Sequence, residues 1–100
     1  GIRDEGLLES ALYRPVQKFQ YEPNSTLPEL AASYSYGIAR NHPFFDGNKR
    51  SALLAAIVFL EINGMKFNAT EEEAVLETIA LAAGERTEEE YAFWLTKNST

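Results

Sequence analysis

The run from Ser51 to Ile62, SALLAAIVFLEI, constrains the fold most, because apolar residues occupy almost every position around a helix. A helix that is apolar on all sides is typical of the centre of a bundle, and this run is too short to span a bilayer. Elsewhere apolar residues recur at helical spacing, and no segment alternates as a half-buried strand does. We therefore expect an all-α protein, a compact helical bundle whose buried central helix covers residues 49–62.

Local start and stop signals predict the helix that opens the chain. It is expected to begin near Asp4 and to end by Phe19 or Gln20. Pro15 predicts a kink or a break within it, because proline lacks the N–H that a helix interior uses. Turn-forming residues then fill positions 21–25. One hundred residues suffice for one domain, so we expect a single domain over the whole chain.

A threonine followed three residues later by a glutamate is the signature of a helix N-terminal capping box. This pattern occurs three times, at residues 26–29, 70–73 and 87–90. In the last two cases a triplet of glutamates follows the threonine, which places negative charge at the positive end of the helix dipole. We interpret these triplets as caps and not as metal sites.

The composition limits the partners that the protein can have. The net charge is −6 and no helix is rich in basic residues, so we expect no direct binding to nucleic acid or to anionic membranes. Cysteine is absent, which excludes disulfides and a cysteine nucleophile. No signal segment opens the chain, and the cytoplasm is the expected location. The chain begins at Gly1 without a methionine, so we expect an N-terminal element to be missing.

The exception to this acidic character is the segment NHPFFDGNKR at residues 41–50, with Arg40 just before it. Pro43 disfavours helical geometry at His42, so the second helix should end near Asn41 and leave His42 in a turn. Three cations then stand near a single carboxylate, which favours a small anion as the ligand.

Each polar residue of this segment has a chemistry that suits phosphate transfer. Lys49 and Arg50 would lie in the first turn of the next helix, where a cation is unfavourable unless an anion binds there. Gly47 allows a tight turn and a close approach of the ligand. Asp46 is a suitable Mg²⁺ ligand, and His42, the only histidine, is the best proton acceptor near neutral pH. Taken singly, each has a structural explanation; their coincidence in one loop favours function.

Residues 42–50 resemble the signature of the Fic/Doc family, His-x-Phe-x-Asp/Glu-Gly/Ala-Asn-Gly/Lys-Arg, and residues 1–15 resemble the start of its death-on-curing branch. The resemblance implies an all-α fold and the transfer of part of ATP to a hydroxyl of a protein. By position, it implies the following roles: His42 as the base, Asp46 as the Mg²⁺ ligand, Gly47, Asn48, Lys49, Arg50 and Arg40 as the ATP-phosphate site, and Phe44 as the anchor of the loop.

Lys49 decides between two products. The AMP-transferring branch of the family has a glycine here, whereas lysine goes with the death-on-curing branch and with phosphorylation of the target. We therefore prefer a kinase-like transferase to an AMP transferase. The alternative of another class is a catalytically silent module that binds an antitoxin and regulates transcription.

The resemblance also implies partners. They are a cognate antitoxin with a C-terminal helix and a protein substrate, with translation elongation factor Tu as the candidate. It further suggests that the family's N-terminal helix is missing from this chain. Residues 20–25 are either the flap that aligns the target in this family or a plain turn between helices.

Overall fold

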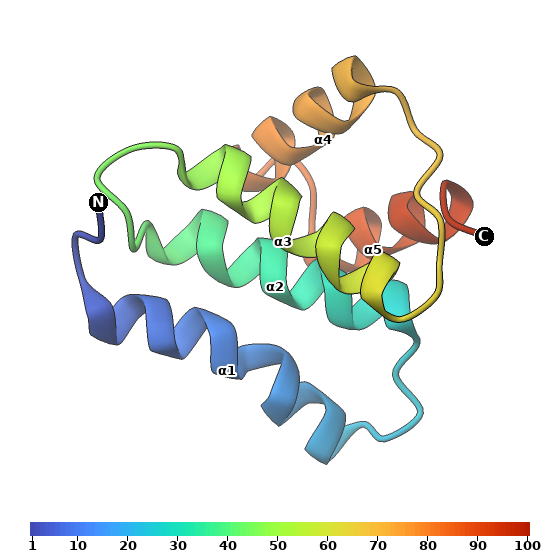
Figure 1. Cartoon of the computed structure of the whole chain (residues 1–100), viewed down its shortest axis with the longest axis horizontal. Coiled ribbons are helices and arrows are strands. Elements are labelled where there is room, and N and C mark those ends of the chain that lie inside the picture. Colours follow the sequence, from blue (N-terminus) through green and yellow to red (C-terminus); the bar gives the residue numbers. More distant parts are fainter.

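A computed structural model describes all 100 residues and contains five helices and no extended sheet. They are α1 (Glu5–Tyr21), α2 (Leu27–Asn41), α3 (Asn48–Ile62), α4 (Glu71–Ala83) and α5 (Glu88–Lys97) (Figure 1). Strand-like pairing is limited to two isolated bridges, Ile2 with Phe44 and Phe67 with Ser99. The prediction of an all-α protein is confirmed. None of the helices is both long enough and apolar enough to cross a membrane.

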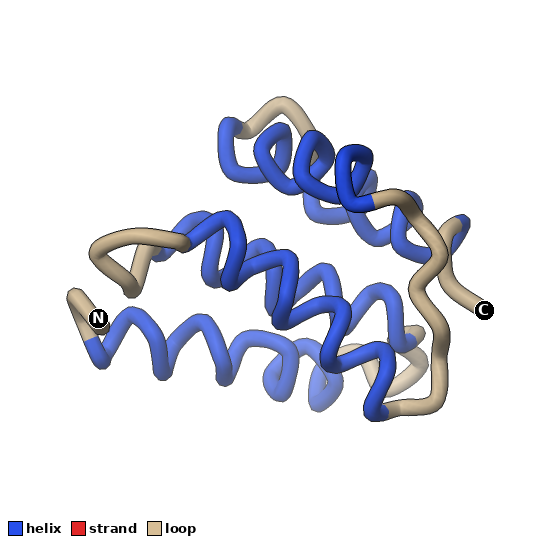
Figure 2. The backbone as a smooth tube through the Cα atoms, turned by 45° about the horizontal axis from the view of Figure 1, so that its top comes forward, coloured by secondary structure: helices blue, strands red, loops and turns tan.

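The helix at the centre of the bundle is α2 and not α3, which corrects the expectation from the sequence. α2 is the only helix that contacts each of the other four, and Figure 2 shows it between α1 and the pair α4 and α5. α3 packs only on α2 and α4. On α3 only Ala52, Ala56 and Leu60 are buried.

The outer face of α3 remains open to solvent. Leu54 and Val58 are each 51% exposed and Ile62 is 77% exposed. A helix that is apolar on all sides can be buried on every side. Whether it is buried depends on how many other helices pack against it. Within this chain, α2 and α4 pack against α3, and no helix covers the face that carries Leu54 and Val58.

Small side chains explain why α2 occupies the centre. Nine of its fifteen residues are buried, among them Ala31, Ala32, Ser33 and Ser35. A Cβ on Gly37 would lie only 3.1 Å from the Cα of Ala11 on α1, so the two backbones approach closely at this point. Close approach needs small residues on the facing surfaces, and a search for large apolar residues overlooks such a helix.

The predicted caps are present. The hydroxyls of Thr26, Thr70 and Thr87 each accept a hydrogen bond from the N–H three residues later, and Asp4 does the same for α1. α1 continues through Pro15 to Tyr21 without a break. Pro15 is buried, and its packing compensates for the backbone hydrogen bond that proline cannot make.

Buried polar contacts join the helices around this centre. The Thr78 hydroxyl and the Tyr91 hydroxyl lie 2.8 Å apart, and Ser35 donates to the carbonyl of Ala52 at 2.6 Å. Burial raises the pKa of Tyr91 above its ordinary value, so this phenol stays neutral at physiological pH. These contacts join α4 to α5 and α2 to α3.

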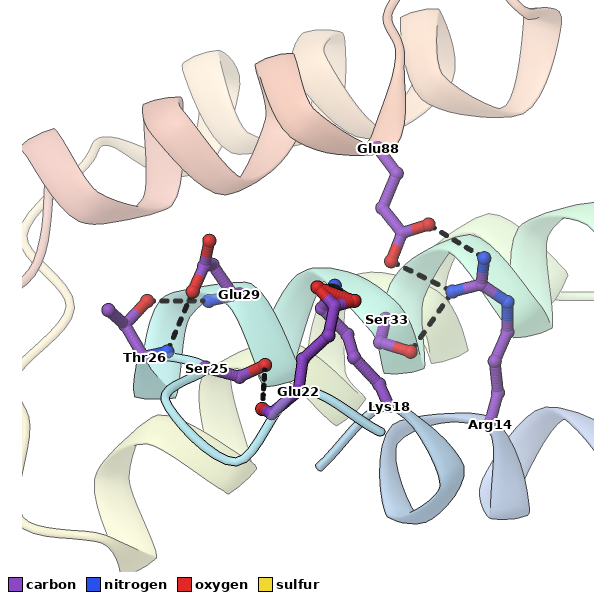
Figure 3. Close-up of polar contacts among 8 residues, drawn as sticks. All are labelled: Arg14, Lys18, Glu22, Ser25, Thr26, Glu29, Ser33 and Glu88. Atoms are coloured by element: carbon purple, nitrogen blue, oxygen red, sulfur yellow. Dashed lines mark hydrogen bonds and ion pairs between the residues drawn. The ribbon is translucent and has the colours of Figure 1, made fainter. Parts of the chain in front are cut away.

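Arg14 connects the outer helix α1 to the N-terminus of α5. Its guanidinium donates two hydrogen bonds to the Glu88 carboxylate, at 2.8 and 2.7 Å, and one to the hydroxyl of Ser33 on α2, at 3.0 Å (Figure 3). It also lies 4.6 Å from the centre of the Tyr36 ring. The hydrogen bonds to Glu88 raise the pKa of Arg14, and this two-pronged pair fixes α1 relative to α5 across α2.

Candidate active site

The segment that the sequence singles out forms the loop between the C-terminus of α2 and the N-terminus of α3. His42 is the C-terminal cap of α2, with left-handed backbone angles of φ 49° and ψ 55°. It is the only non-glycine residue with a positive φ, a conformation that residues with a Cβ rarely adopt. Its imidazole is exposed and makes no hydrogen bond within the protein. It is therefore available to a reactant.

Two interactions hold the loop in shape. The Asn48 side chain accepts a hydrogen bond from the Phe44 N–H at 3.0 Å and donates one to the Phe44 carbonyl at 2.9 Å. Phe44 itself packs against a small core of Ala11, Ile38, Ala39 and Ala52. The next residue, Phe45, is 73% exposed. Only one of the two phenylalanines faces inward, because the chain turns outward toward Asp46.

The first residues of the chain lie alongside this loop (Figure 1). The N–H groups of Arg3 and Asp4 donate to the Pro43 carbonyl at 2.7 and 3.1 Å, and the N–H of Phe45 donates to the Gly1 carbonyl at 3.2 Å. The Arg3 side chain adds two more bonds, from Nε to the His42 carbonyl at 2.8 Å and from Nη2 to the Asn41 carbonyl at 3.2 Å. No local sequence pattern predicts these contacts.

The N-terminus of α3 lacks the cap that every other helix has. Gly47 occupies the cap position with φ 75°, so no side chain caps the helix. The first N–H with a main-chain partner inside the helix is that of Ser51, which donates to the Gly47 carbonyl at 2.9 Å. The N–H groups of residues 48–50 are therefore free, as at any uncapped helix start.

The charges at this helix start are positive and uncompensated. No acidic residue lies in the first turn of α3, while Lys49 and Arg50 do, and both side chains are exposed. The ion pairs of the molecule involve other cations, namely Arg14, Lys18 and Arg86. Free N–H groups, the positive end of the helix dipole and two unpaired cations together form a site for an anion.

Asp46 lies at the edge of this anion site. Its Oδ1 accepts the Gly47 N–H at 2.8 Å, and its Oδ2 has no partner within the protein. No group of three or more histidine or acidic side chains is arranged as a metal site. A single carboxylate is the number of protein ligands that Mg²⁺ often uses when phosphate oxygens and water complete its shell, so the residues present fit Mg²⁺ bound together with a phosphate.

Arg40 lies on the last turn of α2 and turns toward the α4–α5 connection. Its guanidinium carbon is 5.9 Å from the centre of the Tyr36 ring, and its Nη1 lies near Gly84. Its contact with a phosphate stays a prediction.

Comparison with known proteins identifies the family of the chain. The model of the Fic/DOC family matches residues 1–60, which include the whole loop. The chain belongs to the Fic/Doc family. It is 39% identical over 85 residues to the protein kinase doc of Escherichia phage P1, covering 85% of this chain and 67% of that protein. It is 42% identical over 69 residues to the toxin Doc of Mycolicibacterium smegmatis, covering 68% of this chain and 53% of that protein.

The Fic/Doc flap does not lie at residues 20–25 in this chain, so the plain turn is the correct reading of that segment. Residues 20 and 21 finish α1, and the turn that follows is closed by the Ser25 N–H donating to the Glu22 carbonyl. This turn lies at the start of α2, whereas His42 lies at its end. Fifteen helical residues separate the two by roughly 22 Å. The segment beside the Fic/Doc loop is instead residues 1–4.

Proposed function

We propose that this Fic/Doc protein is the toxin of a toxin–antitoxin pair and transfers a phosphoryl group from ATP to a hydroxyl of a protein target. The observation that carries the proposal is the start of α3, an uncapped helix N-terminus with two unpaired cations, one loop away from the only histidine. An anionic phosphate there would use the free N–H groups and both charges at once. The similarity to a protein kinase and to a toxin supports it.

Each residue has one task in this proposal. His42 accepts the proton of the target hydroxyl, for which its free, exposed imidazole is suited. The N–H groups of Asn48, Lys49 and Arg50, with the side chains of the two cations, bind the phosphate oxygens. Asp46, whose Oδ2 has no partner within the protein, would hold Mg²⁺, and the ion would supply positive charge next to the phosphates.

Four residues support these tasks. Both polar ends of the Asn48 side chain are used by Phe44, so Asn48 contributes to the anion site through its main chain. Phe44 anchors the loop in the core. Gly47 keeps the helix start open, because a cap side chain would compete with the ligand for the N–H groups. We assign Arg40 a secondary phosphate contact.

Lys49 favours phosphoryl over AMP transfer, because its side chain fills the space and adds a charge where the AMP-transferring branch has glycine. The test uses ATP labelled on either the α or the γ phosphate, with Mg²⁺ and either a cell lysate or purified elongation factor Tu. Label from the γ phosphate alone supports the kinase. Label from the α phosphate would identify an AMP transferase instead, and no label from either would remove the enzymatic proposal.

His42→Ala should abolish transfer and leave the fold intact, because the exposed imidazole has no protein partner to lose. A lost general base costs roughly 10²- to 10⁴-fold in rate. The matched control is Lys66→Ala, an exposed residue beyond the far end of α3 whose side chain makes no hydrogen bond. Circular dichroism checks the fold of both. Retained transfer by the histidine variant would remove His42 as the base.

The second candidate function is a catalytically silent module that binds an antitoxin. It predicts that any nucleotide affinity is the same with and without Mg²⁺ and is unchanged by Asp46→Ala. The kinase proposal predicts that both changes weaken binding, because Asp46 would hold a Mg²⁺ ion that offsets phosphate charge. Titration calorimetry of ATP with the two proteins separates these cases.

A groove between α3 and α4 supports an antitoxin helix as partner. It has a volume of about 600 Å³ and is lined mainly by apolar side chains, among them Leu53, Leu54 and Val75, and it reaches Lys49 and Arg50. An amphipathic helix placed there would extend to the phosphate site. We expect the product of an adjacent reading frame to abolish ATP binding in calorimetry, and Leu54→Glu to prevent this. Undiminished ATP binding in the presence of that product would contradict the proposal.

A further inference from the structure

The strongest unassigned feature beside the site is the contact between the Arg3 side chain and the last turn of α2. Nε donates to the His42 carbonyl at 2.8 Å and Nη2 donates to the Asn41 carbonyl at 3.2 Å. Both carbonyls belong to the end of a helix, where no intrahelical N–H remains to pair with them. The planar guanidinium presents two donors in a fixed relative orientation, so it fixes the direction of both peptide groups.

The residue that these bonds hold is in an unfavourable conformation. His42 has φ 49° and is the only non-glycine residue of the chain with a positive φ. Such a conformation persists only where surrounding contacts impose it. The loop after His42 is held by Asn48 and Phe44, but those bonds act on residue 44 and do not reach the His42 peptide. Arg3 supplies the one side-chain contact to the His42 main chain.

Neighbouring main-chain bonds fix the position of Arg3 itself. Its own N–H and that of Asp4 donate to the Pro43 carbonyl, and Ile2 pairs with Phe44 as an antiparallel bridge. From α2, the Asn41 side chain donates to the Leu7 carbonyl of α1 at 3.0 Å. The start of the chain, α1 and the end of α2 therefore form one bonded unit around His42.

We propose that Arg3 is a positioning residue for His42: its two hydrogen bonds to the Asn41 and His42 carbonyls hold the histidine backbone in the left-handed conformation that aims the imidazole at the reacting hydroxyl. This inference rests on the proposed transferase function for its consequence in catalysis. Its structural part, the control of the His42 conformation, stands independently of the reaction. Arg3 itself touches no reactant.

The test exploits the fact that His42 is the only histidine in the chain. In isotopically labelled protein, its imidazole gives a single set of NMR signals that needs no further assignment. We compare the wild type with Arg3→Ala, with Arg3→Lys and with Lys66→Ala, which removes an exposed cation elsewhere. Arg3→Lys keeps the charge but loses the planar pair of N–H donors. It remains a test if the alanine variant does not fold.

In Arg3→Ala, the imidazole signals should move and broaden, and kcat should fall by roughly 10- to 100-fold, the size of effect that a misplaced group produces. The KM for ATP should stay at its wild-type value, because the phosphate site on α3 is untouched. Arg3→Lys should show the same changes in smaller degree, and Lys66→Ala should match the wild type. A loss of thermal stability alone, with wild-type signals and kcat, would overturn the proposal.

Two outcomes separate the inference from the proposed function. If the wild type transfers nothing, the function fails, and the imidazole spectrum of Arg3→Ala alone decides the inference: changed signals support it, and wild-type signals overturn it. If Arg3→Lys restores the wild-type spectrum completely, the charge alone matters, and positioning by the two hydrogen bonds is overturned.

Discussion

The N-termini of α3 and α5 are built in opposite ways. At α5 the Thr87 hydroxyl caps the helix, the Glu90 carboxylate accepts the Thr87 N–H at 2.8 Å, and three glutamates fill the first turn. At α3 a glycine occupies the cap position, no side chain caps the helix, and the first turn carries Lys49 and Arg50. The chain itself caps the start of α5, whereas no side chain caps the start of α3.

The chain does not lack acidic residues that could occupy the first turn of α3. The chain has fifteen acidic residues against nine Lys and Arg, and pairs such as Arg14 with Glu88 and Arg86 with Glu77 show that cations elsewhere find carboxylates. Leaving two cations unpaired at the positive end of a helix costs about 0.3–1 kcal/mol each. The phosphate site proposed above would explain why this cost persists at α3.

Arg50→Glu would reduce the difference in charge between the two helix starts, and it should have the largest effect on ATP affinity. It gives α3 an acidic first turn like that of α5, so ATP affinity should fall by roughly 10- to 150-fold, the value of one charge-assisted hydrogen bond. Stability of the free protein should rise by about 0.3–1 kcal/mol from the dipole interaction. Calorimetry with ATP and Mg²⁺ measures the first effect, and urea unfolding measures the second.

Lower ATP affinity together with higher stability would distinguish this effect from a general loss of folding. The matched control is Lys66→Glu, the same charge reversal on an exposed residue outside any helix, which should leave ATP affinity unchanged. A stability loss in Arg50→Glu, or ATP affinity equal to the wild type, would show that the start of α3 is not an anion site.

Thr87→Ala removes the cap at the other helix start and should act on stability alone. Loss of a threonine cap costs about 0.5–2 kcal/mol in the free energy of unfolding. ATP affinity should not change, because the cap belongs to α5 and makes no contact with the loop at residues 42–47. Thr87→Ser, which keeps the hydroxyl, should retain most of the stability. Reduced ATP affinity in Thr87→Ala would mean that the two helix starts are coupled.

The capping sites could be predicted from the sequence because both partners lie within four residues. The loop at residues 42–50 could also be predicted, because a histidine, a carboxylate, a helix start and two cations follow one another within nine residues. Local geometry decides such features, and tertiary packing only has to leave them intact.

The features that the sequence did not predict depend on distant partners. Arg3 and His42 are separated by 39 positions, and Arg14 and Glu88 by 74, so no local pattern marks either contact. The apolar run of α3 predicted that α3 lies at the centre of the bundle. The central helix is α2, where a glycine and several alanines and serines allow closer packing. Which face of a helix is covered is decided by its neighbours.

The smallest expected effect concerns the pH dependence of the α5 start. The hydrogen bond from the Thr87 N–H, assisted by the Thr87 hydroxyl and the Arg86 charge, holds the pKa of Glu90 below its ordinary value. A carboxyl whose pKa is lower in the folded state adds stability above its unfolded pKa, and this contribution disappears as the pH falls through the folded value. The wild type should therefore lose more stability on acidification than Glu90→Gln does.

Thermal unfolding between neutral pH and about pH 3, just below the ordinary glutamate pKa, measures this difference. Glu89→Gln is the matched control, because it removes a carboxylate of the same turn that accepts no hydrogen bond, and it should follow the wild type. The first turn of α3 has no carboxylate, so it has no counterpart of the Glu90 effect. Identical acid sensitivity in the wild type and Glu90→Gln would mean that the Glu90 bond contributes nothing. The contrast between the two helix starts would then rest on the threonine caps and the unpaired cations alone.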